Sequence, residues 1–338
     1  MPKVSVVIPS YNHARFLRRR LDTVLQQSFR DFEVIVVDDC STDESRSILS
    51  EYAKNPKIRI EFNAKNSGST FKQWNKGIHL SRGEYIWLAE SDDYADARLL
   101  EHLAGALDAE PAAGFAYCRS WKVDSEDRPN GFIEEYLMDL DQDHWTVGFC
   151  AEGLDECKNY FVFRNVVTNA SAVVFRKSIY DAVGGADESF QLCGDWKLWA
   201  SMALRGRVLH LSEPLNYFRF HDGTVRSRDM KGGILAHESL RVVRWLLDQV
   251  TVPDTRRSKL FQTLSDLWIP PVIALGGVPI RLKWAILREA TAMDSLAVRR
   301  MLRPALMAAW KKLGRLSRLA TYKLISMATH KHSSKREY

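Results

Sequence analysis

Apolar, strand-like runs alternate with helical stretches along the first ninety residues of this chain, and this alternation restricts the fold more than any other feature. The runs are rich in β-branched and aromatic residues, whereas the stretches between them repeat apolar residues at helical spacing. Strands that alternate with helices in this way favour βαβ units and a doubly wound α/β sheet. The strand-like runs cover residues 4–8, 32–37, 58–62 and 85–89, and the helical stretches cover residues 14–27, 44–54 and 70–80.

Polar side chains follow three of these predicted strands directly. Tyr11 comes after the first strand, Asp38 and Asp39 end the second, and Asp92 and Asp93 follow the fourth. Ligands of open α/β sheets bind outside the carboxyl ends of the strands, so we expect these side chains to form one site.

The pair Asp92 and Asp93 has two interpretations. Two like charges about 4 Å apart repel by roughly 4 kcal/mol at an effective dielectric constant of 20, and a divalent cation with oxygen ligands would offset that repulsion. The other interpretation is an acidic turn that closes the strand, with Asp93 at the start of a helix.

Charge is distributed unevenly along the chain. Residues 1–228 carry a net charge of −6, whereas residues 229–338 carry +12. This shift predicts a boundary near residue 228, followed by an α-helical region over residues 229–329 and a disordered tail over residues 330–338. The stretch 297–327 is a basic amphipathic helix by its pattern, which is compatible with peripheral membrane contact or with a helical cap. The basic residues lie on helices without interleaved aromatic side chains, so no nucleic-acid partner is expected.

The sequence predicts a reduced, cytoplasmic protein, for which peripheral contact with the inner face of the membrane is one option. The five cysteines form no CxxC pair, which argues against a disulfide framework or a zinc site. No charged and then apolar leader precedes the first strand. The longest uncharged run, residues 267–280, contains three prolines and is too short to cross a bilayer.

Five segments, in order and spacing, resemble the inverting glycosyltransferases of family 2, which have the GT-A fold. The resemblance covers roughly residues 1–228. The segments are VSVVIPSYN, VIVVDDCSTD, NSGST with NKGIHLSRGEYIWLAESDDY, GDWKLWASMALRG and YFRFHDGTVR.

The resemblance implies a nucleotide-sugar donor and a Mn²⁺ or Mg²⁺ cofactor. Asp93 and His221 are the implied metal ligands, and Asp92 would contact the ribose or sugar. Either Asp38 or Asp39 would accept a hydrogen bond from the base, since a carboxylate is acceptor-only. The remaining donor-binding residues implied by the resemblance are Pro9, Tyr11, Asn66, Ser69 and Arg226.

Asp195 resembles the family's general base, which would take the proton of the attacking acceptor hydroxyl. The alternative is that Asp195 only caps a helix. Many relatives have Glu-Asp here, whereas this chain has Gly194 before Asp195. It also has Glu90-Ser91-Asp92-Asp93 instead of Asp-x-Asp, so the role of Glu90 stays open.

The expected function is metal-dependent, inverting sugar transfer to a hydroxyl of a glycan or lipid-linked acceptor, in surface polysaccharide biosynthesis. The alternative is a nucleotide-sugar binding module without catalytic activity. Residues Asp92, Asp93, Asp195 and His221 together favour the enzyme.

Overall fold

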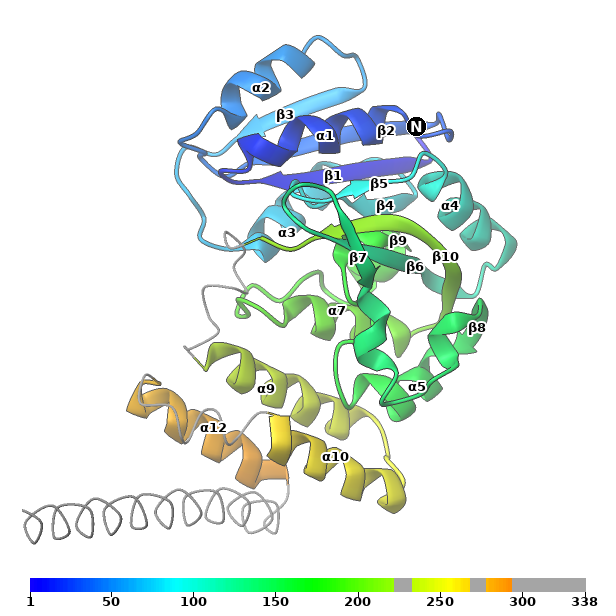
Figure 1. The fold of residues 1–338 in the computed structure, drawn as a ribbon, viewed down its shortest axis with the longest axis vertical. Helices are drawn as coiled ribbons and strands as arrows, with labels where there is room; N and C mark the ends of the chain where they lie inside the picture. The colour runs from blue at the N-terminus through cyan, green and yellow to red at the C-terminus, as the bar shows by residue number, and fades with distance from the viewer. Residues whose placement is uncertain (222–232, 268–277, 294–338) are drawn as a thin grey trace, which may run out of the picture. The chain divides into compact units, whose positions relative to one another are not determined.

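A mixed β-sheet of ten strands runs through the computed structural model, which describes residues 1–221, 233–267 and 278–293 (Figure 1). The strands are β1 (Val4–Ser10), β2 (Phe32–Asp38), β3 (Ile58–Phe62), β4 (Tyr85–Leu88), β5 (Tyr94–Ala95), β6 (Ala113–Val123), β7 (Pro129–Phe132), β8 (Phe149–Glu152), β9 (Val173–Arg176) and β10 (Arg207–Arg219). Their order is β3-β2-β1-β4-β9-β6-β10-β5, with β7 beside β6 and β8 beside β10. The first four strands pair in parallel, whereas β9 is antiparallel to both β4 and β6. The predicted doubly wound, mixed α/β sheet is confirmed.

Helices connect the parallel strands and cover both faces of this sheet (Figure 1). The described α-helices are α1 (Ala14–Leu25), α2 (Ser45–Tyr52), α3 (Thr70–Leu80), α4 (Leu99–Ala109), α5 (Gly153–Glu156), α6 (Lys177–Ala182), α7 (Gly194–Ala203), α9 (Ile234–Gln249), α10 (Asp254–Leu267) and α12 (Ile280–Met293). Short 3₁₀ or π turns are η1 (Ile133–Leu137), η2 (His144–Thr146), η3 (Cys157–Phe161) and η4 (Ala170–Ala172).

The alternation of side chains along the strands separates two apolar layers. Val4, Val6 and Ile8 of β1 pack with buried residues of α1, α2 and α4. Val7 points to the opposite face, where α3 comes so close that a Cβ atom on Gly77 would lie 2.3 Å from a methyl group of Val7. The sheet is therefore buried on both faces, as its nearly continuous apolar strands predict.

Two compact units divide the chain, Met1–Val252 and Pro253–Tyr338. The first unit includes α9, whose residues Leu240, Val243 and Leu246 are fully buried. The charge shift near residue 228 therefore does not coincide with the division by packing. In the second unit the described elements are α10 and α12, which agrees with the expected helical region. The expected amphipathic helix at 297–327 and the tail at 330–338 lie outside the described residues.

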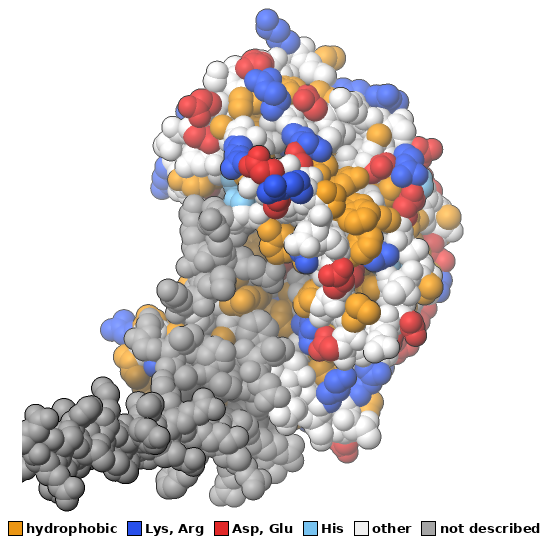
Figure 2. Space-filling model, in the orientation of Figure 1, with side chains coloured by type: hydrophobic (Ala, Val, Ile, Leu, Met, Phe, Trp, Pro, Cys, Tyr) orange, Lys and Arg blue, Asp and Glu red, His pale blue; other side chains and the backbone are white. Residues whose placement is uncertain are grey.

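Acidic and basic side chains are interspersed on the face of the first unit that Figure 2 shows. This part of the described surface carries no broad basic patch, in keeping with the expectation of no nucleic-acid partner, which stays a prediction. Among the helices that the structure describes, none has both the length and the apolar character that a membrane span requires.

Candidate active site at the carboxyl ends of the parallel strands

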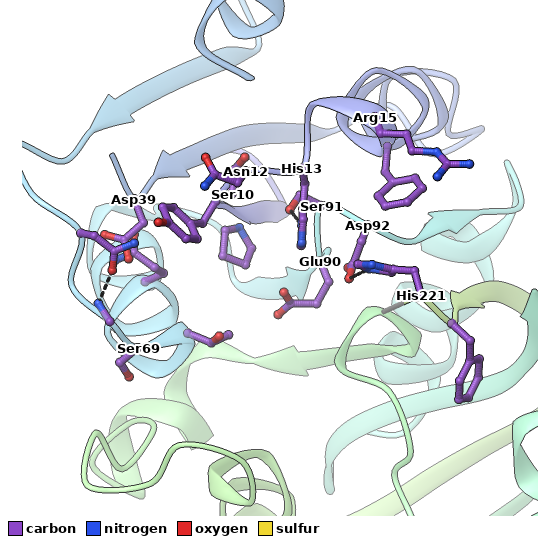
Figure 3. Close-up of a pocket in the computed structure, with 18 of the residues that line it drawn as sticks. Ser10, Asn12, His13, Arg15, Asp39, Ser69, Glu90, Ser91, Asp92 and His221 are labelled. Carbon is purple, nitrogen blue, oxygen red and sulfur yellow. Dashed lines mark hydrogen bonds and ion pairs between the residues drawn. The ribbon is translucent and has the colours of Figure 1, made fainter. Parts of the chain in front are cut away.

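A pocket of about 920 Å³ opens where β1, β2 and β4 end (Figure 3). Asp39 and Ser69 lie at one end of it, and Asp92 and His221 lie at the other. The described residues that line the pocket are Pro9, Ser10, Tyr11, Asn12, His13, Arg15, Phe16, Asp39, Asn66, Gly68, Ser69, Thr70, Gln73, Glu90, Ser91, Asp92, Asp124, Ser125, Gln191, Phe220 and His221.

Four of the predicted donor-binding residues, Pro9, Tyr11, Asn66 and Ser69, line this pocket together. Tyr11 is 40% exposed, so its ring is available to a ligand. The sequence left Asp38 and Asp39 as alternatives, and the geometry distinguishes them. Only Asp39 of the two lines the pocket, which favours it as the base-binding residue.

Asp38 is fully buried beneath the loop that follows β2. Its Oδ1 accepts hydrogen bonds from the Ser41 backbone N–H at 3.0 Å and from Arg46 Nε at 3.3 Å. It thus shapes the turn, which is the alternative role that the sequence offered for an aspartate here.

Asp39 holds the loop that contains Asn66 and Ser69. Its Oδ1 accepts from Asn63 Nδ2 at 2.7 Å and from the Ser67 N–H at 2.9 Å, and its Oδ2 accepts from Ser67 Oγ at 2.8 Å. Gly68 then takes a φ of +70°, a conformation that glycine adopts without strain. The carboxylate therefore fixes one wall of the pocket while remaining part of its lining.

His13, Asp92 and His221 gather at the other end of the pocket, with one ligand atom from each within 4.8 Å of the other two. His221 Nε2 lies 3.0 Å from Asp92 Oδ2. Burial works to raise the pKa of Asp92, but the hydrogen bond with His221 and the nearby His13 outweigh it, so the pKa lies below its usual value. An ionised carboxylate and two imidazoles make a donor set that fits a divalent metal.

Asp93, which the sequence proposed as a metal ligand, does not face this cluster. It is 1% exposed, and its Oδ2 accepts from Asn169 Nδ2 at 2.9 Å and from Ser171 Oγ at 2.7 Å. Its Oδ1 accepts from the Arg219 N–H at 2.9 Å. Burial first, and then the charge of Asp92, raise the pKa of Asp93 to about 6. Asp92, and not Asp93, thus lines the pocket together with His221, which does not favour the predicted role of Asp93 as a metal ligand.

The bonds of Asp93 connect the loop after β4 to the end of β10. Arg219, whose N–H donates to Asp93, also donates from Nε to the Asp92 carbonyl oxygen at 2.7 Å. Because His221 follows two residues after Arg219, these two bonds, both donated by Arg219, bring Asp92 and His221 together.

Glu90, whose role the sequence left open, lies in the pocket lining with its carboxyl group toward the open space (Figure 3). Trp74 Nε1 donates to its Oε1 at 2.7 Å. Burial, followed by the charge of Asp92, raises the pKa of Glu90 to about 8. Glu90 is therefore a polar pocket residue and not only a core residue.

Asp195 lies in the first turn of α7, and its side chain is half-buried. Asn165 Nδ2 donates to its Oδ2 at 2.9 Å, and the Trp196 N–H donates to its Oδ1 at 2.7 Å. Asp195 is not among the described residues that line the pocket, although Gln191, four residues earlier, is. The N-cap of α7 is Cys193, so Asp195 does not occupy the capping position that the sequence offered as its alternative.

Close packing against α3 explains why residue 194 is a glycine, which the sequence alone did not reveal. A Cβ atom here would lie 2.6 Å from the ring of Phe71 on α3. A side chain at position 194 would therefore collide with the Phe71 ring, which accounts for the glycine.

Sequence reasoning missed His13, Gln73 and Gln191, and it left Asn165 without a role. His13 had a detectable signal, because it directly follows the loop after the first strand, and Gln73 lies one helical turn after Ser69. Gln191 lies far along the chain, and only folding places it at the pocket. Arg226 lies outside the described residues.

Comparisons with known proteins relate part of this chain to glycosyltransferases. Residues 5–158 match the family model of "Glycosyl transferase family 2", a match that ends before Asp195 and His221. The chain is 34% identical over 110 residues to the poly(ribitol-phosphate) beta-N-acetylglucosaminyltransferase TarS of Staphylococcus aureus, covering 32% of this chain and 19% of TarS. It is 40% identical over 93 residues to the putative teichuronic acid biosynthesis glycosyltransferase TuaG of Bacillus subtilis, covering 27% of this chain and 36% of TuaG. The chain thus aligns with about a fifth to a third of the length of these relatives.

Solved structures share the fold. Residues 1–349 of S. aureus TarS in complex with UDP-GlcNAc match with a TM-score of 0.63 and 19% identity, over 88% of this chain and 81% of that one. The mannosyltransferase PcManGT from Pyrobaculum calidifontis, in complex with GDP-Man and Mn²⁺, matches with a TM-score of 0.57 and 18% identity, over 99% and 88% of the two chains. Residues 5–158 therefore resemble glycosyltransferase family 2, and the chain shares the GT-A fold of these solved glycosyltransferases.

Proposed function

We propose that this protein is an inverting, metal-dependent glycosyltransferase that moves a sugar from a nucleoside-diphosphate donor to a hydroxyl group of a glycan or lipid-linked acceptor. The observation that carries the proposal is the two-ended pocket, with Asp39 and its loop at one end and Asp92 with His221 at the other. A donor has the same two parts, a base that needs hydrogen-bond partners and a diphosphate that needs positive charge.

The Asp39 end would hold the base. Asp39 would accept the hydrogen bond of a base N–H, while the exposed ring of Tyr11 offers a face for stacking beside Pro9. Asn66 and Ser69 would contact the donor from the loop that Asp39 anchors. Arg226 stays a prediction as a phosphate contact.

The Asp92 end would hold Mn²⁺ or Mg²⁺, with Asp92 and His221 as ligands. When bound, the metal would neutralise charge on the leaving nucleoside diphosphate, as Lewis-acid catalysis requires. Asp93 would act as a positioning residue that aligns the two ligands through Arg219.

Asp195 would serve as the general base. Its bond from Asn165 fixes the orientation of the carboxylate, so that the acceptor hydroxyl could lose its proton to Asp195 while its oxygen attacks the anomeric carbon from the face opposite the diphosphate. Attack from that face inverts the anomeric configuration.

A role in cell-surface polysaccharide biosynthesis is supported by the names of TarS and TuaG, which are relatives over part of this chain. The predicted helix at 297–327 would bring the enzyme to a membrane that carries lipid-linked acceptors. Flotation with anionic liposomes, comparing the full chain with a chain that ends at residue 296, tests this part.

The deciding experiment is a donor screen that measures released nucleoside diphosphate, with purified protein and Mn²⁺ or Mg²⁺. Turnover should stop with EDTA and in Asp195→Asn, while the circular dichroism spectrum of the variant stays that of the wild type. Donor binding without turnover over a broad acceptor panel would instead favour the inactive binding module. Undiminished turnover in Asp195→Asn would overturn the assignment of the base.

A further inference from the structure

We infer that His13 is a third protein ligand of the metal, and that the site therefore selects Mn²⁺ or Co²⁺ over Mg²⁺ and Ca²⁺. This inference rests on the metal dependence proposed above. It adds His13, which lies in the loop after β1 and outside the segments on which the metal assignment depends. It also chooses between Mn²⁺ and Mg²⁺, which the sequence left as alternatives.

The positions of the three side chains support the inference. One ligand atom each from His13, Asp92 and His221 lies within 4.8 Å of the other two, so a single ion can reach all three with small side-chain movements. All three residues line the donor pocket, at the end opposite Asp39 (Figure 3).

The His13 ring is held by the loop that contains Asp92. His13 Nδ1 lies 2.8 Å from Ser91 Oγ, in the loop that contains Asp92. Ligating histidines commonly use their second ring nitrogen for such an orienting bond. With Nδ1 engaged in this way, we expect Nε2 to be the ligand atom.

Packing also holds the two imidazoles toward each other. The rings of His13 and His221 meet edge to face, with centroids 5.7 Å apart, and Phe16 packs against His221 at 4.9 Å. Phe16 is in turn covered by the guanidinium of Arg219, 4.5 Å from its centroid. Fixed rings lose little freedom when they bind a metal, which favours a preformed site.

The chemistry of the three metal-ligand side chains explains the expected selectivity. Mg²⁺ and Ca²⁺ prefer oxygen ligands and bind imidazole weakly. Two imidazoles and one carboxylate suit the transition metals, and affinity for such a set rises from Mn²⁺ to Co²⁺. A site made of Asp92 and His221 alone would have one imidazole fewer and a weaker preference.

Mn²⁺ titration followed by electron paramagnetic resonance tests the inference with the metal alone, and again with UDP or GDP present. The full-length wild type should bind Mn²⁺, and pulsed spectra should contain ¹⁴N couplings from two imidazoles. His13→Ala should weaken Mn²⁺ binding by about tenfold or more and should lose one of the two couplings. His79→Ala, at an exposed position on α3, is the matched control and should behave as the wild type.

A second variant distinguishes the loss of a metal ligand from misfolding. His13→Gln keeps a polar side chain of similar size and replaces a nitrogen ligand with an oxygen, so the ratio of Mn²⁺ to Mg²⁺ affinity should fall while the melting temperature stays unchanged. Wild-type Mn²⁺ affinity and two ¹⁴N couplings in folded His13→Ala would overturn the inference and leave the proposed function intact. Unchanged Mn²⁺ binding in Asp92→Asn and His221→Ala as well would also refute the metal site of the proposed function.

Discussion

Asp92 and Asp93 are neighbours in the sequence, but their carboxylates have different surroundings. Asp92 faces His221 across the pocket, whereas Asp93 accepts three hydrogen bonds from buried protein groups. The fully buried guanidinium of Arg20 lies 4.0 Å from Asp93 and adds a compensating charge. The same side-chain chemistry therefore lines the pocket at one position and holds the buried structure beneath it at the next.

Single substitutions of Asp92 and Asp93 distinguish the roles of the two carboxylates. Asp93→Asn should lower the free energy of unfolding by about 1.5–3 kcal/mol, because an amide nitrogen would face the donors that now bind a charged acceptor. Asp92→Asn should change stability much less and should abolish Mn²⁺ binding. Urea unfolding and metal titration on both variants provide the measurements. Loss of metal binding in Asp93→Asn without loss of stability would restore Asp93 as the ligand.

Glu134 is a buried acid outside the pocket, and it predicts a dependence of stability on pH. Burial raises its pKa to about 7, although the Ser120 N–H donates to its Oε1 at 3.0 Å. A carboxyl group whose folded pKa exceeds the unfolded value of 4.5 stabilises the fold fully below pH 4.5, and this contribution is lost as the pH rises toward 7.

Glu134→Gln keeps the acceptor for Ser120 but cannot ionise. Relative to the wild type, this variant should therefore gain stability between pH 5 and pH 8, by about 3 kcal/mol at most. Chemical unfolding of both proteins at the two pH values measures the gain. An equal difference in stability at pH 5 and pH 8 would contradict the raised pKa.

At the scale of elements, α9 contacts the loop that leads into the candidate site, although it follows the segment that resembles the family. Glu238 on α9 is 3% exposed, and its carboxylate accepts backbone N–H bonds from Gln191, Leu192 and Cys193 at 2.8, 2.8 and 2.9 Å. Those three residues precede α7, and Gln191 lines the pocket. One carboxylate thus fixes the loop between the donor pocket and the proposed base.

Glu238→Gln should lower kcat by about tenfold and change the donor KM little, because Asp39 and Asp92 are untouched while the loop before Asp195 loses an anionic acceptor. Steady-state kinetics with a donor found in the screen measure both constants. Asp248→Asn, at an exposed position of the same helix, is the control and should match the wild type. A change confined to donor KM would contradict this role.

At the scale of the whole molecule, charge and packing divide the chain at different places. Net charge changes sign near residue 228, but α9 places its apolar side chains in the first unit, which ends at Val252. Charge reflects the side chains that face solvent, whereas the compact unit is defined by the apolar side chains that are buried. A boundary predicted from charge alone therefore excludes α9, although the apolar side chains of this helix are buried in the first unit.

Two truncations test this division. A chain of residues 1–252 should unfold cooperatively and keep nucleotide binding, because it retains Glu238 and the buried face of α9. A chain of residues 1–228 should lose cooperative unfolding or become insoluble, since the surface that α9 covers would be exposed. Thermal unfolding and titration with UDP or GDP measure the outcome. Equal behaviour of the two chains would show that α9 is dispensable.

The sequence by itself determined the α/β architecture, the resemblance to glycosyltransferase family 2 and the sheet edge that carries the candidate site. The architecture and the edge follow from local signals, since periodicity selects strands and helices, and parallel strands place their carboxyl ends at one edge. Tyr11 was found in this way because it directly follows such a strand, whereas Pro9, Asn66 and Ser69 were assigned from the resemblance.

Only the tertiary structure decided which member of each acidic pair faces the pocket. Adjacent residues at the end of a strand point in different directions, and their orientation depends on donors from distant segments, as with Arg219 for Asp93 and Asn63 for Asp39. For the same reason His13, Asn165 and Glu238 could not be assigned from the sequence, because their partners lie about 30 to 80 residues away along the chain and meet them only in the folded protein.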